Sequence, residues 1–198
     1  MVFKRKKEIT FEGVRIISVG RFIECKGHKF LIEALSLVLK VYPNAYLTLV
    51  GGGPLEERLK EQASRLGISN QVQFIEKVSH DKIPSLLGLH NVYIQPSIKD
   101  EETFQEESFG VAALEAMVSG LATVVFECGG LTELASLVNT PAVKVVPQKN
   151  VSELVKAIIY IFENKLVISH AERVKIGELF SSTMNSSQIL RIYGELTQ

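Results

Sequence analysis

Two carboxylates, Glu107 and Glu115, stand on either side of a glycine near the start of an apolar stretch. From Phe109 to Val118 every residue is apolar or glycine except Glu115. A carboxylate in so apolar a helix must find hydrogen-bond donors or face a polar ligand, and a sugar hydroxyl is such a donor. The spacing predicts a helix that begins near Phe109 or Gly110, and the amino end of that helix can hold an anion.

Two cations stand five residues apart in an earlier loop, which runs Val19-Gly-Arg-Phe-Ile-Glu-Cys-Lys-Gly27. Arg21 can bind a phosphate through a forked pair of N–H donors, and Lys26 supplies a point charge. Taken alone, the loop is more typical of a surface Arg and Lys on a turn. It has neither Walker A spacing nor a Gly-x-Gly-x-x-Gly pattern, so neither conventional phosphate-binding motif is supported.

The elements that must position these residues follow an alternating pattern. Apolar runs rich in β-branched residues alternate with segments of helical period, and Gly or Pro marks most junctions. Strands are predicted at residues 15–19, 45–50, 72–75, 92–95, 122–126 and 143–146, and the clearest helices at 28–41, 54–66 and 151–162. Short strands joined by crossover helices imply an α/β fold with a parallel sheet covered on both faces.

Ligands of such sheets bind beyond the carboxyl ends of the strands. The turns Gly51-Gly-Gly-Pro54 and Cys128-Gly-Gly130 also follow strands there, although ordinary strand-to-helix turns explain each one singly. As a set, these loops lie along one edge. An anion at Gly110 with Arg21 and Lys26 opposite suits a diphosphate, and Glu115 lies ~7.5 Å further along the helix at ~1.5 Å per residue. Two carboxylates flanking a diphosphate match a nucleoside diphosphate sugar.

Composition narrows the class of protein. The 198 residues are 46% hydrophobic and 22% charged, with 22 Lys and Arg against 22 Asp and Glu, so no overall field attracts nucleic acid. Cys25 and Cys128 fit neither a metal site nor a disulfide framework, which indicates a reduced compartment. With no transmembrane or signal-peptide pattern, a cytoplasmic location is expected. The basic cluster at residues 4–7 is interpreted as a solvated linker or, alternatively, a membrane-surface contact.

These residues together resemble the retaining glycosyltransferases called glycosyl transferases group 1, which have the GT-B architecture of two Rossmann-like domains. The resemblance covers residues 14–164. It is carried by these segments: Val19-Gly-Arg21 with Glu24-Cys-Lys-Gly27, Leu49-Val-Gly-Gly-Gly-Pro54, Val78-Ser-His80, Gln95-Pro-Ser97, Glu107-Ser-Phe-Gly110 through Glu115-Ala-Met117, and Gly129-Gly130 with Glu133. It implies a single Rossmann-like domain of about six strands, the carboxy-terminal, donor-binding half of such an enzyme.

The resemblance also implies roles for individual residues. Arg21 and Lys26 would bind the donor diphosphate, Glu107 would accept hydrogen bonds from the hexose, and Glu115 would accept them from the ribose. The backbone N–H groups of Phe109, Gly110 and Val111 would donate to the phosphates and the hexose. The backbone near Val78 would contact the base. Gly20 and Ser97 would also belong to the donor-binding site. The resemblance implies no metal and no cofactor, with a UDP- or GDP-hexose as donor substrate and retention of the anomeric configuration.

The sequence departs from the family pattern in two ways. The loop at residues 98–106 is acidic and longer than the family's shortest versions, so Glu106 competes with Glu107 for the hexose role. The family's amino-terminal domain, which binds the glycan or lipid-linked acceptor, is absent. Residues 1–13 are therefore interpreted as an interdomain linker, 14–164 as the nucleotide-sugar-binding domain, and 165–198 as helices outside the sheet at 169–180 and 188–196. The resemblance further suggests peripheral contact with the inner membrane in a full enzyme.

Three functions remain open from the sequence. The first is the donor-binding half of a hexosyltransferase, which is inactive without its acceptor domain. The second is a relative of the nucleotide-sugar epimerases or phosphorylases, which share the architecture, although no pyridoxal lysine is identified here. The third is a noncatalytic nucleotide-sugar-binding module. The sequence leaves open the base, the hexose, the acceptor and the oligomeric state.

Overall fold

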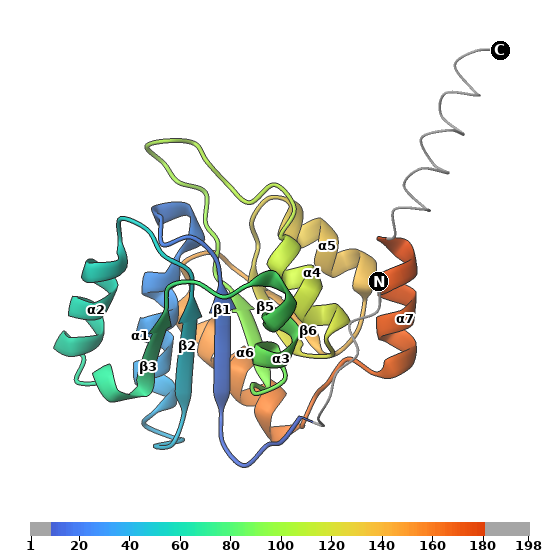
Figure 1. Ribbon diagram of the computed structural model, residues 1–198, viewed down its shortest axis with the longest axis horizontal. Helices are drawn as coiled ribbons and strands as arrows, with labels where there is room; N and C mark the ends of the chain where they lie inside the picture. Colours follow the sequence, from blue (N-terminus) through green and yellow to red (C-terminus); the bar gives the residue numbers. More distant parts are fainter. Residues whose placement is uncertain (1–8, 181–198) are drawn as a thin grey trace.

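The fold is built on one parallel β-sheet of six strands. The computed structural model describes residues 9–180. The strands lie in the order β3-β2-β1-β4-β5-β6, and every neighbouring pair is parallel (Figure 1). They are β1 (Arg15–Val19), β2 (Tyr46–Val50), β3 (Val72–Ile75), β4 (Val92–Gln95), β5 (Ala122–Phe126) and β6 (Val143–Val146). This order confirms the predicted α/β, Rossmann-like fold, and it puts the loops after β1 and β4 side by side at the centre of the sheet.

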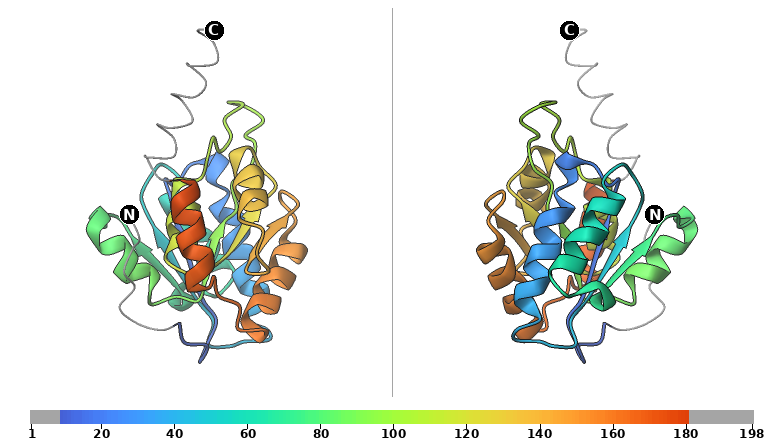
Figure 2. Two further views of the ribbon diagram at one scale, coloured as in Figure 1. Left: turned by 90° about the vertical axis from the view of Figure 1, so that its right-hand side faces the viewer. Right: turned by 90° about the vertical axis from the view of Figure 1, so that its left-hand side faces the viewer.

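Helices cover both faces of the sheet. They are α1 (His28–Val38), α2 (Glu56–Arg65), α3 (Ile83–Leu87), α4 (Val111–Val118), α5 (Gly130–Val138), α6 (Val151–Glu163) and α7 (His170–Leu179), with 3₁₀ turns η1 (Glu24–Lys26), η2 (Ser69–Gln71) and η3 (His80–Lys82). Helices α1, α2 and α6 lie on one face, and α3, α4 and α7 lie on the other (Figure 2). In the described part of the chain, no helix combines the length and the apolar character needed to cross a bilayer.

The core lies on both sides of the central strands. Ile16, Ile17, Tyr93 and Ile94 are fully buried, and every residue of β5 is buried. Strands covered on both faces read as continuous apolar runs, because neither face meets water. The same property makes polar residues in these strands conspicuous, since a buried polar side chain must find a hydrogen-bond partner.

Two predicted helices prove shorter than expected. Helix α1 ends at Val38, because the N–H groups of Lys40 and Val41 bond to carbonyls only three residues back. Val41, predicted to lie on the apolar face, is 58% exposed. The next helix begins at Glu56 rather than Pro54, because Leu55, with φ of −90° and ψ of 0°, lies outside the helical region and is the N-cap.

Helix α7 packs outside the sheet, as the prediction for residues 169–180 requires. Ser169 and Glu172 form a reciprocal capping box at its start. The Arg173 Nε donates to the Val118 carbonyl at the end of α4, at 2.7 Å. The predicted helix at 188–196 and the basic cluster at 4–7 lie outside the described residues.

Asn91 fastens the segment before β1 to the sheet. Its Oδ1 accepts from the Arg15 N–H, and its Nδ2 donates to the carbonyls of Thr10 and Gly13. The side chain is fully buried, so these bonds replace water completely. Asn91 thereby sets where β1 begins, and the end of β1 in turn positions the loop that carries Arg21 and Lys26.

Candidate functional site

The loop after β1 is pressed against the end of β4. Gly27 has φ of 63°, and a Cβ at this position would lie 1.9 Å from the Pro96 carbonyl oxygen. The Ile98 N–H donates to the Cys25 carbonyl at 2.8 Å. Only glycine allows so close an approach of two backbones at this φ. The 3₁₀ turn η1 therefore brings Lys26 beside the Gln95-Pro-Ser97 segment that leaves β4.

The loop before α4 is held in the same way by the turn after β5. A Cβ at Gly129 would lie 2.2 Å from the Glu107 carbonyl oxygen, and the Gly130 N–H donates to that oxygen at 3.0 Å. Gly110 is the N-cap of α4, with φ of 90° and no side-chain cap. The first-turn N–H groups of α4 are thus not satisfied by a capping side chain, as the anion-site prediction requires.

Glu107 is the point on which these loops converge. Its Oε2 accepts hydrogen bonds from Lys26 Nζ and Gln95 Nε2, and Ser97 Oγ lies 3.5 Å from the same oxygen. The side chains of Glu107 and Lys26 are only 12% and 24% exposed. An ion pair with this little exposure is weakly screened by solvent, so the contact holds both side chains in place. Glu106, the alternative in the sequence, is exposed.

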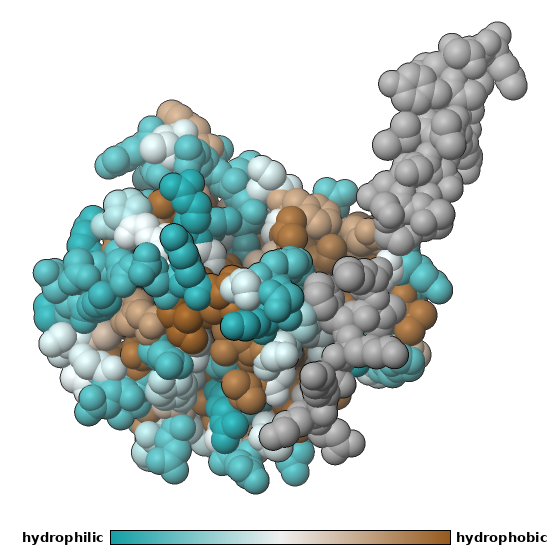
Figure 3. Space-filling view, in the orientation of Figure 1, coloured by the Kyte–Doolittle hydropathy of each residue, from teal (hydrophilic) through white to brown (hydrophobic). Residues whose placement is uncertain are grey.

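Arg21 lies apart from this pair. It is exposed and lines a cavity of about 350 Å³ together with Asp100, Glu102 and Gln105 of the loop between β4 and α4. That loop projects above the sheet, and its surface is mainly hydrophilic (Figure 3). The structure thus brings Lys26 to Glu107, while Arg21 faces the acidic loop on the neighbouring side of the same edge.

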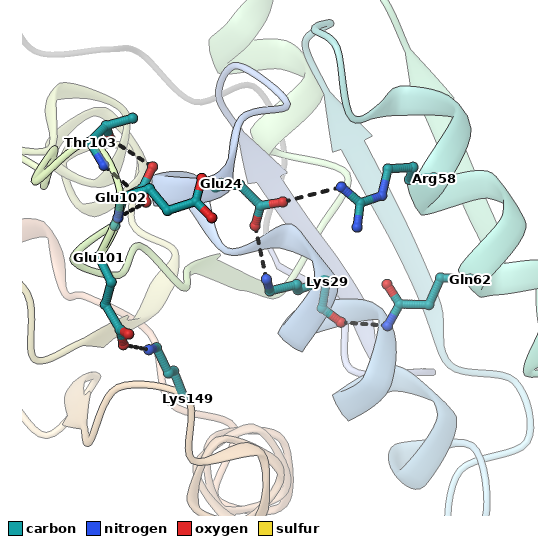
Figure 4. A network of polar contacts seen from close by, with 9 residues as sticks. Glu24, Lys29, Arg58, Gln62, Glu101, Glu102, Thr103 and Lys149 are labelled. Atoms are coloured by element: carbon teal, nitrogen blue, oxygen red, sulfur yellow. Dashed lines mark hydrogen bonds and ion pairs between the residues drawn. The ribbon is translucent and has the colours of Figure 1, made fainter.

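A wider hollow of about 800 Å³ lies next to the Arg21 cavity, between α1, α2 and the acidic loop. Its walls are joined by ion pairs of Glu24 with Lys29 and Arg58, and of Lys149 with Glu101 (Figure 4). Neither Lys26 nor Glu107 lines it. Lys26 and Glu107 thus lie at a part of the edge that is separate from this hollow.

Glu115 lies on α4 with its side chain 18% exposed, and His80 Nε2 is 3.6 Å from its Oε1. Burial raises the pKa of Glu115, and the nearby His80 opposes this increase. His80 belongs to η3, which follows β3 and the half-buried Val78. Glu115 thus faces the segment that the resemblance assigns to the base.

At the start of α4, Phe109 and Val111 are 39% and 61% exposed, whereas Gly110 is buried. Gly20 lies at the end of β1, where its N–H donates to the Val50 carbonyl and a Cβ would meet Lys26 Cδ at 3.8 Å. The residues on either side of Gly110 are therefore exposed at the helix start, and Gly20 leaves space beside the Lys26 side chain.

His28 and the two cysteines lie beneath the site. Burial lowers the pKa of His28 to about 3, with a further contribution from the positive charge of Lys26. Burial raises the pKa values of Cys25 and Cys128. His28 is therefore neutral at physiological pH, and both thiols are protonated, so none of the three supplies charge to the edge. No three His, Cys, Asp or Glu side chains among residues 9–180 gather in a way that could hold a metal ion.

Sequence reasoning missed two contributions to the site. Gln95 has no predicted role, yet it touches Glu107, and Tyr93 in turn donates to Gln95. The available signal is a Gln at the end of a strand that is mainly apolar, since a buried amide requires partners. His80 has no predicted role either, although its Nε2 lies 3.6 Å from the Glu115 carboxylate on α4.

The comparisons with known proteins show the family of the chain. Residues 3–178 match the family described as glycosyl transferases group 1. An uncharacterized glycosyltransferase of Methanocaldococcus jannaschii is 33% identical over 132 residues, which are 67% of this chain and 32% of that protein. The GDP-mannose-dependent alpha-(1-6)-phosphatidylinositol monomannoside mannosyltransferase of Mycolicibacterium smegmatis is 30% identical, over 60% of this chain and 31% of that protein.

Among solved structures, Anabaena HepE in complex with UDP and glucose is 25% identical with a TM-score of 0.74, over 92% of this chain and 48% of that chain. The chain thus spans about a third of these curated relatives and about half of this solved structure. The family match extends over most of the chain, and the sheet order, the glycine contacts and the Lys26–Glu107 edge occur within it. This chain belongs to the glycosyl transferases group 1 family.

Proposed function

We propose that this chain is the donor-binding part of a retaining glycosyltransferase, which moves a hexosyl group from a nucleoside diphosphate hexose to a glycan or glycolipid acceptor. The observation that carries the proposal is the partly buried convergence of Lys26, Gln95 and Ser97 on Glu107 beside the start of α4, which has no side-chain cap. A cation, an anion-binding helix end and a fixed carboxylate are then present together at the ligand edge of the sheet.

Lys26 and Glu107 have complementary tasks in this proposal. An ammonium group has three N–H donors, so Lys26 can keep its bond to Glu107 while another N–H meets a phosphate oxygen. Glu107, as an acceptor, binds hexose hydroxyl groups. The pair thereby links recognition of the diphosphate to recognition of the sugar attached to it.

The chemical step needs stabilisation of the departing nucleoside diphosphate. As the bond between the anomeric carbon and the phosphate oxygen breaks, negative charge grows on that oxygen, the acceptor oxygen bonds to the anomeric carbon, and the acceptor proton passes to the departing diphosphate. Lys26 and the first N–H groups of α4 offset this charge from fixed positions, and the exposed side chain of Arg21 adds positive charge from the neighbouring side of the edge. Glu115 accepts from the ribose hydroxyls, and the backbone near Val78 meets the base. The acceptor is bound by a second domain.

Calorimetric titration of the chain with UDP-glucose, UDP-N-acetylglucosamine and GDP-mannose tests the proposal. At least one donor should bind, with equal affinity in EDTA. Replacing Lys26 by Met removes a charge-assisted hydrogen bond worth about 1.5–3 kcal/mol, so affinity should fall by roughly 10- to 150-fold. Lys29→Met is the matched control, because Lys29 lies three residues away but pairs with Glu24 in the neighbouring hollow.

Failure of every nucleotide sugar to bind would refute the proposal, as would equal losses in Lys26→Met and Lys29→Met. Transfer is tested by supplying an acceptor-binding domain of a relative in trans and following the anomeric proton of the product by NMR. Inversion of configuration contradicts the retaining assignment. Donor binding without any transfer favours the noncatalytic binding module instead.

A further inference from the structure

A chain of hydrogen bonds runs from the core of the sheet to Glu107. The Tyr93 hydroxyl donates to Gln95 Oε1 at 3.0 Å, and Gln95 Nε2 donates to Glu107 Oε2. Tyr93 and Gln95 are two residues apart on β4 and therefore point to the same face of the sheet. Tyr93 is fully buried and Gln95 is only 4% exposed, so water does not compete with these bonds.

Glu107 and Tyr93 together fix the orientation of the Gln95 amide. A glutamine amide has one accepting and one donating end, and a rotation of 180° exchanges them. An ionised carboxylate only accepts, so the NH₂ group is directed at Glu107, and the Tyr93 hydroxyl donates to the oxygen at the other end of the amide. A leucine of similar size at position 95 would fill the same space but would leave Glu107 without this donor.

The hydrogen-bond donors contact only one of the two carboxylate oxygens of Glu107. Lys26, Gln95 and Ser97 all approach Oε2, and among residues 9–180 no hydrogen bond to Oε1 is found. Glu107 follows a long loop, and a free glutamate has many rotamers, so ordering it on binding costs free energy. The hydrogen bonds from Lys26 and Gln95 to Oε2 restrict these rotamers before any ligand binds.

We propose that Gln95, oriented by Tyr93, is a positioning residue that holds Glu107 so that Oε1 meets a hydroxyl of the transferred hexose. This inference rests on the proposed function. Lys26 and the start of α4 bind the diphosphate, and Lys26 also contacts Glu107, whereas the Gln95 side chain donates to Glu107 and so acts only on recognition of the sugar. Replacing Gln95 should therefore weaken binding of the nucleotide sugar and leave binding of the free nucleoside diphosphate unchanged.

The test compares two ligands on each protein, the nucleotide sugar that the wild type binds and its free nucleoside diphosphate. For Gln95→Leu, affinity for the nucleotide sugar should fall about tenfold, as expected for one hydrogen bond to a charged group, with the nucleoside diphosphate unchanged. Tyr93→Phe should give a smaller loss in the same direction. Thr123→Val, a buried polar-to-apolar change next to Tyr93 on β5, is the matched control and should change neither affinity.

The outcomes separate this inference from the proposed function. If the wild type binds neither ligand, the proposed function fails. If it binds both and Gln95→Leu keeps the full preference for the nucleotide sugar, the proposed function stands and the role of Gln95 is refuted. Equal losses for both ligands in Gln95→Leu indicate general damage to the fold and also refute the positioning role, whereas retained nucleoside diphosphate affinity shows that the variant is folded.

Discussion

His28 should make the stability of this domain depend on pH in a range where its carboxylates are still ionised. The ring is 3% exposed and packs edge-on against Phe22, with the ring centroids 5.1 Å apart. Its pKa falls from 6.5 to about 3 because burial excludes water and Lys26 adds positive charge. In the unfolded chain both causes vanish, so the ordinary pKa returns.

The sign and the magnitude follow from these two pKa values. Between about pH 6.5 and pH 3 the unfolded chain binds a proton at His28 that the folded chain does not, so the free energy of unfolding falls as the pH is lowered. At 1.36 kcal/mol per pKa unit, lowering the pH from 7 to 5 should remove about 2 kcal/mol. The loss continues toward pH 3 and ends once folded His28 also takes up a proton.

Urea unfolding of the wild type and of His28→Phe at pH 5, 6 and 7 measures this effect. Phenylalanine keeps the aromatic packing and does not titrate, and the His28 Nδ1 has no hydrogen-bond partner among the described residues to lose. The variant should therefore lose about 2 kcal/mol less than the wild type over this range. Buried His90 also has a lowered pKa but titrates in both proteins, so its effect cancels. Equal pH slopes would refute the reasoning.

Two further predictions concern contacts made by the backbone at the start of β1 and in the loop that follows it. In a urea titration, Gly27→Ala should lower the free energy of unfolding by about 2–4 kcal/mol, because its Cβ would clash with the Pro96 carbonyl and the residue has an unfavourable φ. Gly67→Ala is the control. Gly67 has φ of 70° but no atom within 4 Å of an added Cβ, so this variant should lower the free energy of unfolding by only about 1 kcal/mol. Asn91→Leu should cost about 3 kcal/mol because three partly buried backbone groups lose the partner that this side chain provides, and a thermal midpoint equal to that of the wild type would contradict this account.

The strands were predictable because a strand buried on both faces appears in the sequence as a run of apolar residues. Five of the six strands begin and end at the predicted residues, and the exception, β2, begins one residue later at Tyr46. Helix ends were less predictable. Val41 continues the apolar spacing of α1, but the turn that leads into β2 unwinds the helix at Val38. The apolar spacing alone therefore does not show at which residue a helix ends.

The site was predictable as an edge but not as a set of contacts. Parallel strands place Lys26 and Glu107 at the same rim, yet 81 residues separate them, and sequence spacing does not state that they touch. Their contact depends on backbone approaches that only the folded chain shows. Gln95 was overlooked because the strand pattern treats its position as one more interior residue, and the hydrogen-bond partner that accounts for the amide comes from the loop before α4.

The contact between the Gly129-Gly130 turn and the backbone of Glu107 and Ser108 restricts how this region can be exchanged between relatives. Positions 129 and 130 have no room for a side chain, since Cβ atoms there would lie 2.2 and 2.1 Å from the carbonyl oxygens of Glu107 and Ser108. The turn at residues 129–130 and the backbone at residues 107–108 therefore fit only each other. A chimera that takes the loop before α4 from a relative must also take the turn after β5 from that relative.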